Sequence, residues 1–258
     1  MFWTLIRSEL ALWAAKGKTA QLWWRDDDAR APSHALDRLL AISSAYEVPL
    51  TLAVIPDSRN GALARRLKSQ PLVSVAQHGA HHQNRIGVRR PSEFPADVTL
   101  GQISKEISSG WRRVSHLPRA LKVFVPPWNA VHPLLREALC REGFVAWSAF
   151  GGGRIECSLP RFDADLDILT WGRRPRFAGE ARALLRLYDL LRTRRRAGRW
   201  DEPLGLLTHH MDMDEDAWAF LGRFLAETRR HKGATWRGLP DFVTPVAHWP
   251  KILLGRAA

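Results

Sequence analysis

Short apolar runs alternate with longer amphipathic segments along most of the chain, and this alternation restricts the possible folds more than any other feature. The short runs are almost continuously apolar and lack the strict polar–apolar alternation of a half-exposed strand. Such runs are typical of parallel strands that are buried on both faces. We predict strands at seven of them: Leu22–Arg25, Leu50–Ile55, Leu72–Ala76, Leu121–Val125, Phe144–Trp147, Leu166–Thr170 and Leu204–Thr208.

The segments between these runs have the apolar spacing of amphipathic helices, and residues 2–13 share that spacing. We predict helices over 33–46, 58–69, 99–117, 131–142, 178–197 and 214–231. Side chains suited to cap a helix N-terminus precede three of them: Ser33, the pair Asp57 and Ser58, and either Asp212 or Asp214. Strands interleaved with helices predict an α/β fold, either a β/α barrel or a doubly wound sheet, in a single domain over 1–258.

The composition is that of a soluble globular enzyme, with 45% hydrophobic and 25% charged residues among 258. It excludes a disordered, collagenous or coiled-coil chain. No apolar run approaches the roughly 20 residues that cross a bilayer, so we expect no transmembrane segment. The two cysteines, Cys140 and Cys157, have no paired spacing, which is typical of reduced thiols. We therefore expect a cytoplasmic protein.

The formal net charge of +13 comes mainly from 32 arginines, against 7 lysines. A basic chain raises the question of a nucleic-acid partner. The arginines are scattered, however, and only 192–199 form a dense run, at the end of a predicted helix where cations are favoured. We expect no specific nucleic-acid partner and favour solvated helix faces as the explanation, with an anionic partner as the alternative.

Polar side chains that can bind metal or move protons follow four of the predicted strands. Asp26, Asp27 and Asp28 follow the first strand, and His78, His81 and His82 follow the third. Pro126, Pro127, Trp128 and Asn129 follow the fourth, and His209 and His210 follow the seventh. Because catalytic groups of β/α folds gather at the carboxyl ends of strands, we expect these segments to meet.

These residues suit a hydrolytic metal centre. Three adjacent carboxylates beside a buried strand need a cation or hydrogen-bond donors to neutralise them. His78 and His82 are four residues apart and could converge on one ion. Two imidazoles and one carboxylate leave coordination positions open for water and substrate, as catalytic zinc sites do.

At these positions the chain resembles the polysaccharide deacetylases, the NodB-like proteins of carbohydrate esterase family four. The family's paired aspartates match Asp26-Asp27, and its His-(Ser/Thr)-x-x-His motif matches 78–82. Its Arg-Pro-Pro-aromatic motif matches 125–128, and its Leu-x-His motif matches 207–209. The motifs occur in the family's order and span residues 24–210. Candidates for its fourth motif are Asp163, Asp165, Asp167 and Trp171.

The resemblance implies a distorted (β/α) barrel with about seven parallel strands. It implies that Asp26 is the general base and His209 the general acid of a metal-dependent deacetylase. It also implies that Asp27, His78 and His82 hold one divalent ion, zinc first, with cobalt or nickel as alternatives. The close competitors for these roles are Asp28, His81 and His210, and the residues expected to contact substrate are Arg25, Pro127, Trp128, Asn129 and Trp171.

The chain departs from the family's motifs at three positions. Gly79 replaces the Ser or Thr whose hydroxyl braces the histidine motif, and Asp28 stands where a glycine is usual. Val125 replaces the arginine that holds the catalytic aspartate, and we expect the adjacent Arg25 to hold Asp26 instead.

Four functions remain open on the sequence. The first is removal of an acetyl group from an amino sugar or related small amide. The second is hydrolysis of a non-carbohydrate amide, and the third is sugar or metabolite binding without catalysis. The fourth is a metal-dependent phosphodiesterase or nuclease. The oligomeric state also remains open.

Overall fold

The computed structural model describes residues 2–87, 89–151 and 159–243. Its main sheet has the strand order β5-β4-β3-β2-β1-β9-β6, with β10 added beside β1, and every neighbouring pair is parallel. The strands are β1 (Ala20–Ala29), β2 (Leu50–Val54), β3 (Val73–His78), β4 (Ala120–Val125), β5 (Ala146–Trp147), β6 (Ala164–Asp167), β9 (Leu204–Thr208) and β10 (Ala234–Trp236). The predicted parallel α/β fold is confirmed.

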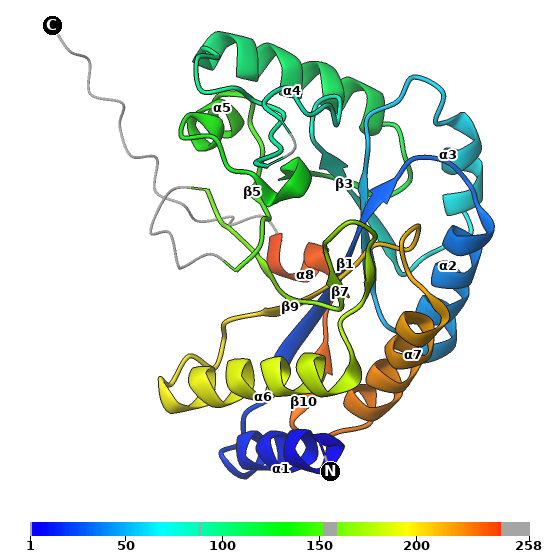
Figure 1. Cartoon of the computed structure of the whole chain (residues 1–258), viewed down its shortest axis with the longest axis vertical. Coiled ribbons are helices and arrows are strands. Elements are labelled where there is room, and N and C mark those ends of the chain that lie inside the picture. The colour runs from blue at the N-terminus through cyan, green and yellow to red at the C-terminus, as the bar shows by residue number, and fades with distance from the viewer. Residues whose placement is uncertain (1, 88, 152–158, 244–258) are drawn as a thin grey trace, which may run out of the picture.

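The sheet curls into a distorted barrel, which decides between the two predicted architectures. Parallel bridges join Trp147 to Arg161 and Phe150 to Ala164, so the segment after β5 lies beside the start of β6. Figure 1 shows the larger helices arranged around the outside of this curled sheet. The edge strands therefore meet instead of forming the open edges of a doubly wound sheet.

Seven of the helices follow the predicted pattern, and α8 is an addition. They are α1 (Phe2–Ala15), α2 (His34–Tyr46), α3 (Gly61–Leu67), α4 (Leu100–Val114), α5 (Leu135–Arg141), α6 (Glu180–Arg196), α7 (Glu215–Arg229) and α8 (Leu239–Val243). The side chains of Ser33 and Asp214 cap α2 and α7 as predicted. Asn60, and not Asp57 or Ser58, precedes α3 and makes no side-chain cap. No helix in the described part of the chain has the length and hydrophobicity to span a membrane.

The strand side chains divide into an outer and an inner core. Leu22 and Trp24 of β1 belong to the large cluster shared with the surrounding helices. Trp23 belongs to a second cluster with Ala53 and Ala76, the inward residues of β2 and β3. Successive side chains of a strand point to opposite faces, so residues with the parity of Trp23 point into the barrel. Arg25 continues that inward row.

Two strands differ from the prediction in ways that affect the site. β1 continues to Ala29, so the three aspartates lie within the strand and not after it. The strand predicted over Leu166–Thr170 is interrupted, because the Asp167 carboxylate accepts the Leu169 N–H at 2.9 Å and turns the chain. The residues beyond it, β7 (Leu169–Thr170) and β8 (Arg176–Phe177), form an antiparallel hairpin.

The close approach of β9 to β6 requires a glycine. A Cβ at Gly205 would lie 2.6 Å from the Asp163 carbonyl oxygen and 2.8 Å from Trp23 Nε1. We predict that Gly205→Ala lowers the free energy of unfolding by about 2 kcal/mol or more through overpacking. Gly101→Ala is the matched control, since its Cβ would meet nothing within 4 Å and it lies in α4. Urea denaturation should find the control neutral or slightly more stable, and equal effects of the two changes would contradict the packing account.

Candidate active site

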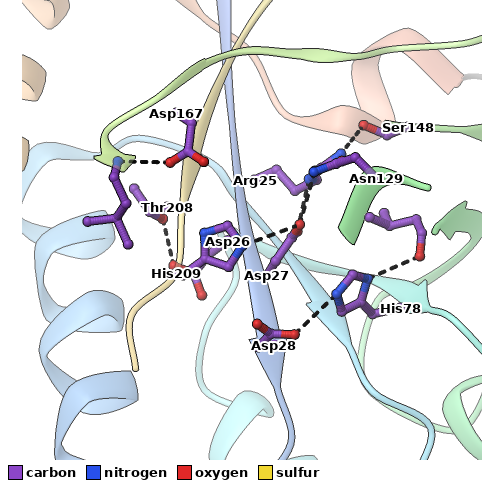
Figure 2. Close-up of polar contacts among 12 residues, drawn as sticks. Arg25, Asp26, Asp27, Asp28, His78, Asn129, Ser148, Asp167, Thr208 and His209 are labelled. Atoms are coloured by element: carbon purple, nitrogen blue, oxygen red, sulfur yellow. Dashed lines mark hydrogen bonds and ion pairs between the residues drawn. The ribbon is translucent and has the colours of Figure 1, made fainter. Parts of the chain in front are cut away.

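The ends of β1, β3, β4 and β9 meet at a cavity of about 1110 Å³. Its lining includes most of the polar residues singled out in the sequence: Asp27, Asp28, His78, His82, Trp128, Asn129, Trp171 and His209. Figure 2 shows side chains from several strands converging on this region. Segments far apart in the chain thus supply one site, as their positions after successive strands predicted.

Asp28, His78 and His82 form a cluster whose donor atoms could hold a metal ion. Asp28 Oδ1 lies 3.2 Å from His78 Nε2 and 2.9 Å from His82 Nε2. One donor atom from each residue lies within 4.8 Å of the other two. The predicted cluster contained Asp27 in place of Asp28, so the structure departs from it by one residue in β1.

The protonation pattern of His78 favours a cation at this cluster. His78 Nδ1 lies 3.0 Å from the Val125 carbonyl oxygen, which can only accept a hydrogen bond. In the neutral ring, Nδ1 then carries the proton, and the lone pair of Nε2 faces Asp28. Asp28 Oδ1 is buried and makes no hydrogen bond of normal geometry with a described residue. Two acceptors that face each other need a proton or a metal ion between them, and a divalent ion fits this donor set.

The pKa shifts of Asp28 and His78 also indicate that this cluster favours a positive charge beside Asp28. Burial disfavours ionised Asp28, but the close imidazole nitrogens of His78 and His82 and their positive charge when protonated outweigh burial and hold its pKa well below the usual range. Burial likewise disfavours charged His78, but the carboxylates of Asp27 and Asp28 outweigh it and raise the pKa of the imidazole. The protein therefore stabilises an anionic Asp28 beside a positively charged partner.

The geometry of β1 explains why Asp28, and not Asp27, lies beside the two histidines. Arg25 and Asp27 are two residues apart and point to the same side, into the barrel, while Asp26 points to the other side. Asp28 has a φ of 70°, and the pairing of β1 with β2 shifts register between Asp26 and Ala29. This irregularity turns Asp28 toward the histidines, as β-bulges commonly re-aim a side chain at a site.

Asp27 is held by a fully buried arginine. Arg25 Nε lies 2.9 Å from Asp27 Oδ1, and Arg25 Nη2 donates to Asp27 Oδ2 at 3.0 Å. The same guanidinium donates to Ser148 Oγ at 2.6 Å and to Asn129 Oδ1 at 2.8 Å (Figure 2). Arg25 was expected to hold the adjacent Asp26, whereas the structure places it on Asp27.

Asp26 and His210 form a separate buried pair that does not line the cavity. Asp26 Oδ1 lies 2.5 Å from His210 Nδ1. Asp26 Oδ2 accepts hydrogen bonds from Thr208 Oγ1 at 2.6 Å and from the His210 N–H at 3.0 Å. Both oxygens are therefore engaged on the far side of β1, away from the position where a substrate would bind. This is not the environment predicted for Asp26.

His209 lines the same cavity as the cluster of Asp28, His78 and His82. Its Nε2 is 3.9 Å from Asp27 Oδ2, and its ring meets the edge of the Trp171 ring at a centroid distance of 4.5 Å. Trp171 is fixed by a hydrogen bond from its Nε1 to Asp167 Oδ2 at 2.7 Å. Burial raises the pKa of Asp167, against the opposing effects of His209 and these hydrogen bonds. Of the four candidates for the fourth motif, Trp171 thus contacts His209, and Asp167 holds Trp171 in place.

The remaining predicted residues have different places. His81 lies outside the cluster, with Nε2 3.8 Å from Glu106 Oε2. Trp128 lines the cavity, and its ring lies 4.8 Å from that of His82. Pro127 is buried and is not among the residues that line the cavity.

Glu93 braces the loop that carries His81 and His82, and the sequence analysis did not predict this role. Its buried carboxylate accepts the backbone N–H groups of Ala80, His81 and His82 at 2.8, 2.5 and 2.6 Å. A Cβ at Gly79, whose φ is 69°, would lie 2.7 Å from Glu93 Oε2. The same Cβ would lie 2.5 Å from Pro127 Cγ, so the proline ring, the carboxylate and the positive φ together account for a glycine at position 79. Glu93 is one of two acidic residues in the loop 85–98 and has no distinguishing pattern, so the unusual glycine was the only signal.

Comparison with known proteins identifies the fold. No family profile matches the sequence, and no curated protein is detectably similar to it. A Mycobacterium smegmatis structure assigned as a polysaccharide deacetylase matches with a TM-score of 0.65 and 17% identity, over 88% of this chain and 90% of that chain. The fold is that of the polysaccharide deacetylases. The resemblance seen in the motifs is therefore confirmed at the level of the fold.

Two further structures share this fold. A family 4 carbohydrate esterase from Streptomyces lividans, in complex with acetate, matches with a TM-score of 0.52 and 16% identity, over 85% of this chain and 91% of that chain. A mutant of a pseudoenzyme from the same esterase family, with restored enzymatic activity, matches with a TM-score of 0.56 and 14% identity. That match covers 87% of this chain and 68% of the other. The fold thus occurs in both active and inactive proteins.

Removal of the Glu93 carboxylate should destabilise the protein. Glu93→Ala leaves three backbone N–H groups without their acceptor, and we predict a loss of about 2–4 kcal/mol in the free energy of unfolding. Glu106→Ala is the control, because it breaks a partly exposed ion pair with Arg85 and should cost less than about 1 kcal/mol. Urea denaturation measures the free energy of unfolding of both variants, and equal losses in the two would argue against a bracing role of Glu93.

The Asp26–His210 pair should make stability depend on pH. Burial opposes protonation of His210, but the charge and hydrogen bond of Asp26 outweigh burial and raise the pKa of the imidazole. The charged pair therefore stabilises the fold fully below the unfolded pKa of about 6.5, and this stabilisation disappears as pH rises through the higher folded pKa. His210→Asn keeps a donor near Asp26 but cannot carry the charge.

We predict that wild type exceeds His210→Asn in unfolding free energy by about 1 kcal/mol more at pH 6 than at pH 9. The measurement is urea denaturation with a chelator present, so that metal binding does not contribute. A difference that is the same at both pH values would show that the pair is neutral in the folded protein.

Proposed function

We propose that this protein is a metal-dependent hydrolase that removes the N-acetyl group of an amino sugar. The observation that carries the proposal is the arrangement in one cavity of a metal-binding cluster, an arginine-held carboxylate and a histidine. These are Asp28 with His78 and His82, then Asp27, and His209 at 3.9 Å from Asp27. The fold shared with deacetylases and carbohydrate esterases supports the same class of reaction.

Asp28, His78 and His82 would hold one divalent ion, and zinc suits two imidazoles and a carboxylate best, with cobalt or nickel as alternatives. When bound, the ion supplies a Lewis acid that acidifies water and polarises the amide carbonyl. The hydrogen bond between His78 Nδ1 and the Val125 carbonyl keeps the imidazole oriented with Nε2 toward the cavity.

In this proposal, Asp27 is the general base. Its carboxylate lines the cavity beside Asp28, and Arg25 holds both of its oxygens in place. A carboxylate fixed in this position can accept a proton from the attacking water. Arg25 thus supplies, from within the same strand, the contact that an arginine at position 125 provides in the family.

His209 is the proposed general acid. Its Nε2 lies 3.9 Å from Asp27 Oδ2, so a base and a proton donor stand side by side in the cavity and can both reach the reacting amide. The imidazolium would give its proton to the amine nitrogen as the C–N bond breaks, which prevents expulsion of an unstable amide anion. The edge of Trp171 against the ring limits its movement.

Aromatic side chains support a sugar as the acylated group. Trp128 and Trp171 line the cavity and remain 39% and 54% exposed. Their position on both sides of the polar cluster offers flat faces on which a sugar ring could stack. Neither residue is buried in either core, so filling space inside the protein does not explain them.

A binding protein without catalytic activity is the second candidate, and the pseudoenzyme neighbour gives it a precedent. The departures from the family motifs do not favour it. The arginine contact that is lost at Val125 is replaced by the ion pair of Arg25 with Asp27. The hydroxyl that is lost at Gly79 is replaced by the Glu93 carboxylate, which holds the backbone of the same loop. Each lost contact has a replacement, as expected if selection maintained the geometry of the site.

The role of Asp27 can be tested by kinetics. Asp27→Asn keeps the shape of the side chain but removes the base, and we predict a fall in kcat of about 10²–10⁴-fold in acetate release from N-acetylglucosamine oligomers. The control is His81→Ala, which alters a neighbouring histidine outside the cluster and should retain activity. Full activity of Asp27→Asn would refute the proposed base.

A further inference from the structure

We propose that the substrate carries an anionic group, a phosphate or a carboxylate, and that Arg182 and Arg186 of α6 bind it. This inference rests on the proposed deacetylase function and specifies its substrate class. It comes from the part of the cavity that lies beyond the catalytic groups.

The cavity is larger than removal of an acetyl group requires. Its volume of about 1110 Å³ exceeds the roughly 300–1,000 Å³ of most ligand pockets. From the metal-binding cluster it continues past Trp171 to α6, whose first turns form the far wall with Arg182 and Arg186. A substrate with its acetamide at the cluster can therefore extend a second group to this wall.

The two arginines of this wall are available to a ligand. They are four residues apart on α6, so their side chains lie on the same helix face. Arg182 makes no hydrogen bond or ion pair with any residue in the described ranges, and Arg186 makes only a long 3.5 Å contact from Nε to the Asp165 carbonyl oxygen. Arg194 and Arg195 of the same helix are instead paired with Asp165 and Glu9.

A third arginine lies on the same side of the cavity. Arg176 of β8 stands directly opposite Thr170 of β7, and Thr170 lines the cavity. Residues that face each other across an antiparallel ladder point to the same face of the sheet. Arg176 is exposed and has no acidic partner among the residues that the structure describes. The hairpin thus adds positive charge beside the α6 wall.

The acidic residues nearby do not cancel this charge. Asp165 forms an ion pair with Arg194 at 3.0 Å, and Asp167 accepts the Trp171 indole N–H. Asp189 also lines the cavity, one turn beyond Arg186. In the described part of the chain, Asp189 is thus the one aspartate at this end of the cavity with no recorded ion pair or hydrogen bond, against Arg182 and Arg186 in the lining and Arg176 on the adjoining hairpin.

Guanidinium groups arranged in this way recognise carboxylate and phosphate through paired hydrogen bonds. A neutral polysaccharide would leave these donors unused. The positive wall would attract an anionic substrate into the cavity, and this attraction is a function for part of the arginine excess.

The test compares acetate release from N-acetylglucosamine, N-acetylglucosamine 6-phosphate and N-acetylmuramic acid by the zinc-loaded protein. We expect kcat/KM to be at least about tenfold higher for an anionic sugar than for the neutral one. The phosphate and carboxylate probes show which anion the wall prefers. In Arg182→Gln/Arg186→Gln, the ratio of anionic to neutral kcat/KM should fall toward one.

The matched control is Arg192→Gln/Arg196→Gln, which removes two charges at the same spacing from the other end of α6 and should leave the ratio unchanged. Equal kcat/KM for all three sugars, or equal effects of the two double variants, would overturn the anionic substrate while the deacetylase proposal stands.

No acetate from any probe would count against the deacetylase proposal itself. Calorimetric binding of the phosphorylated sugar then decides the inference separately. Binding that is lost only in Arg182→Gln/Arg186→Gln supports the anion site, and binding that is absent or equal in both variants overturns it.

Discussion

The candidate site depends on one buried ion pair, Arg25 with Asp27. Both side chains are almost completely removed from solvent, and loss of either partner from such a pair usually costs about 3–5 kcal/mol. The guanidinium also reaches Asn129 and Ser148, so it joins the ends of β1, β4 and β5 around the proposed base. The conformation of β1 that satisfies Arg25 is the one that leaves Asp28, and not Asp27, beside the histidines.

The barrel and the meeting of polar segments at one end of it were predictable, because buried parallel strands have a clear apolar pattern. The roles of the three aspartates were harder to assign. The alternation from Trp23 would place Arg25 and Asp27 on one face, and this argument favours Asp27 as the partner of Arg25. The positive φ of Asp28 that turns it toward His78 has no signature in a row of identical residues.

Other features depend on contacts between segments that are distant in the sequence. Glu93 braces the loop that carries His82, and only the replacement at Gly79 indicated a change there. The split between β6 and β7 depends on a local bond to Asp167, which competes with an otherwise continuous strand pattern. In both cases a side-chain carboxylate accepts backbone N–H groups, and neither composition nor hydrophobic periodicity reveals such a bond.

The central claim is that Asp28, and not Asp27, completes the metal-binding cluster with His78 and His82. It is tested most directly by elemental analysis of purified Asp28→Ala and Asp27→Ala after incubation with zinc and removal of excess metal. The account predicts about one zinc ion per chain in the wild type, retention of zinc in Asp27→Ala and its loss in Asp28→Ala. Zinc lost from Asp27→Ala but retained in Asp28→Ala would contradict the account.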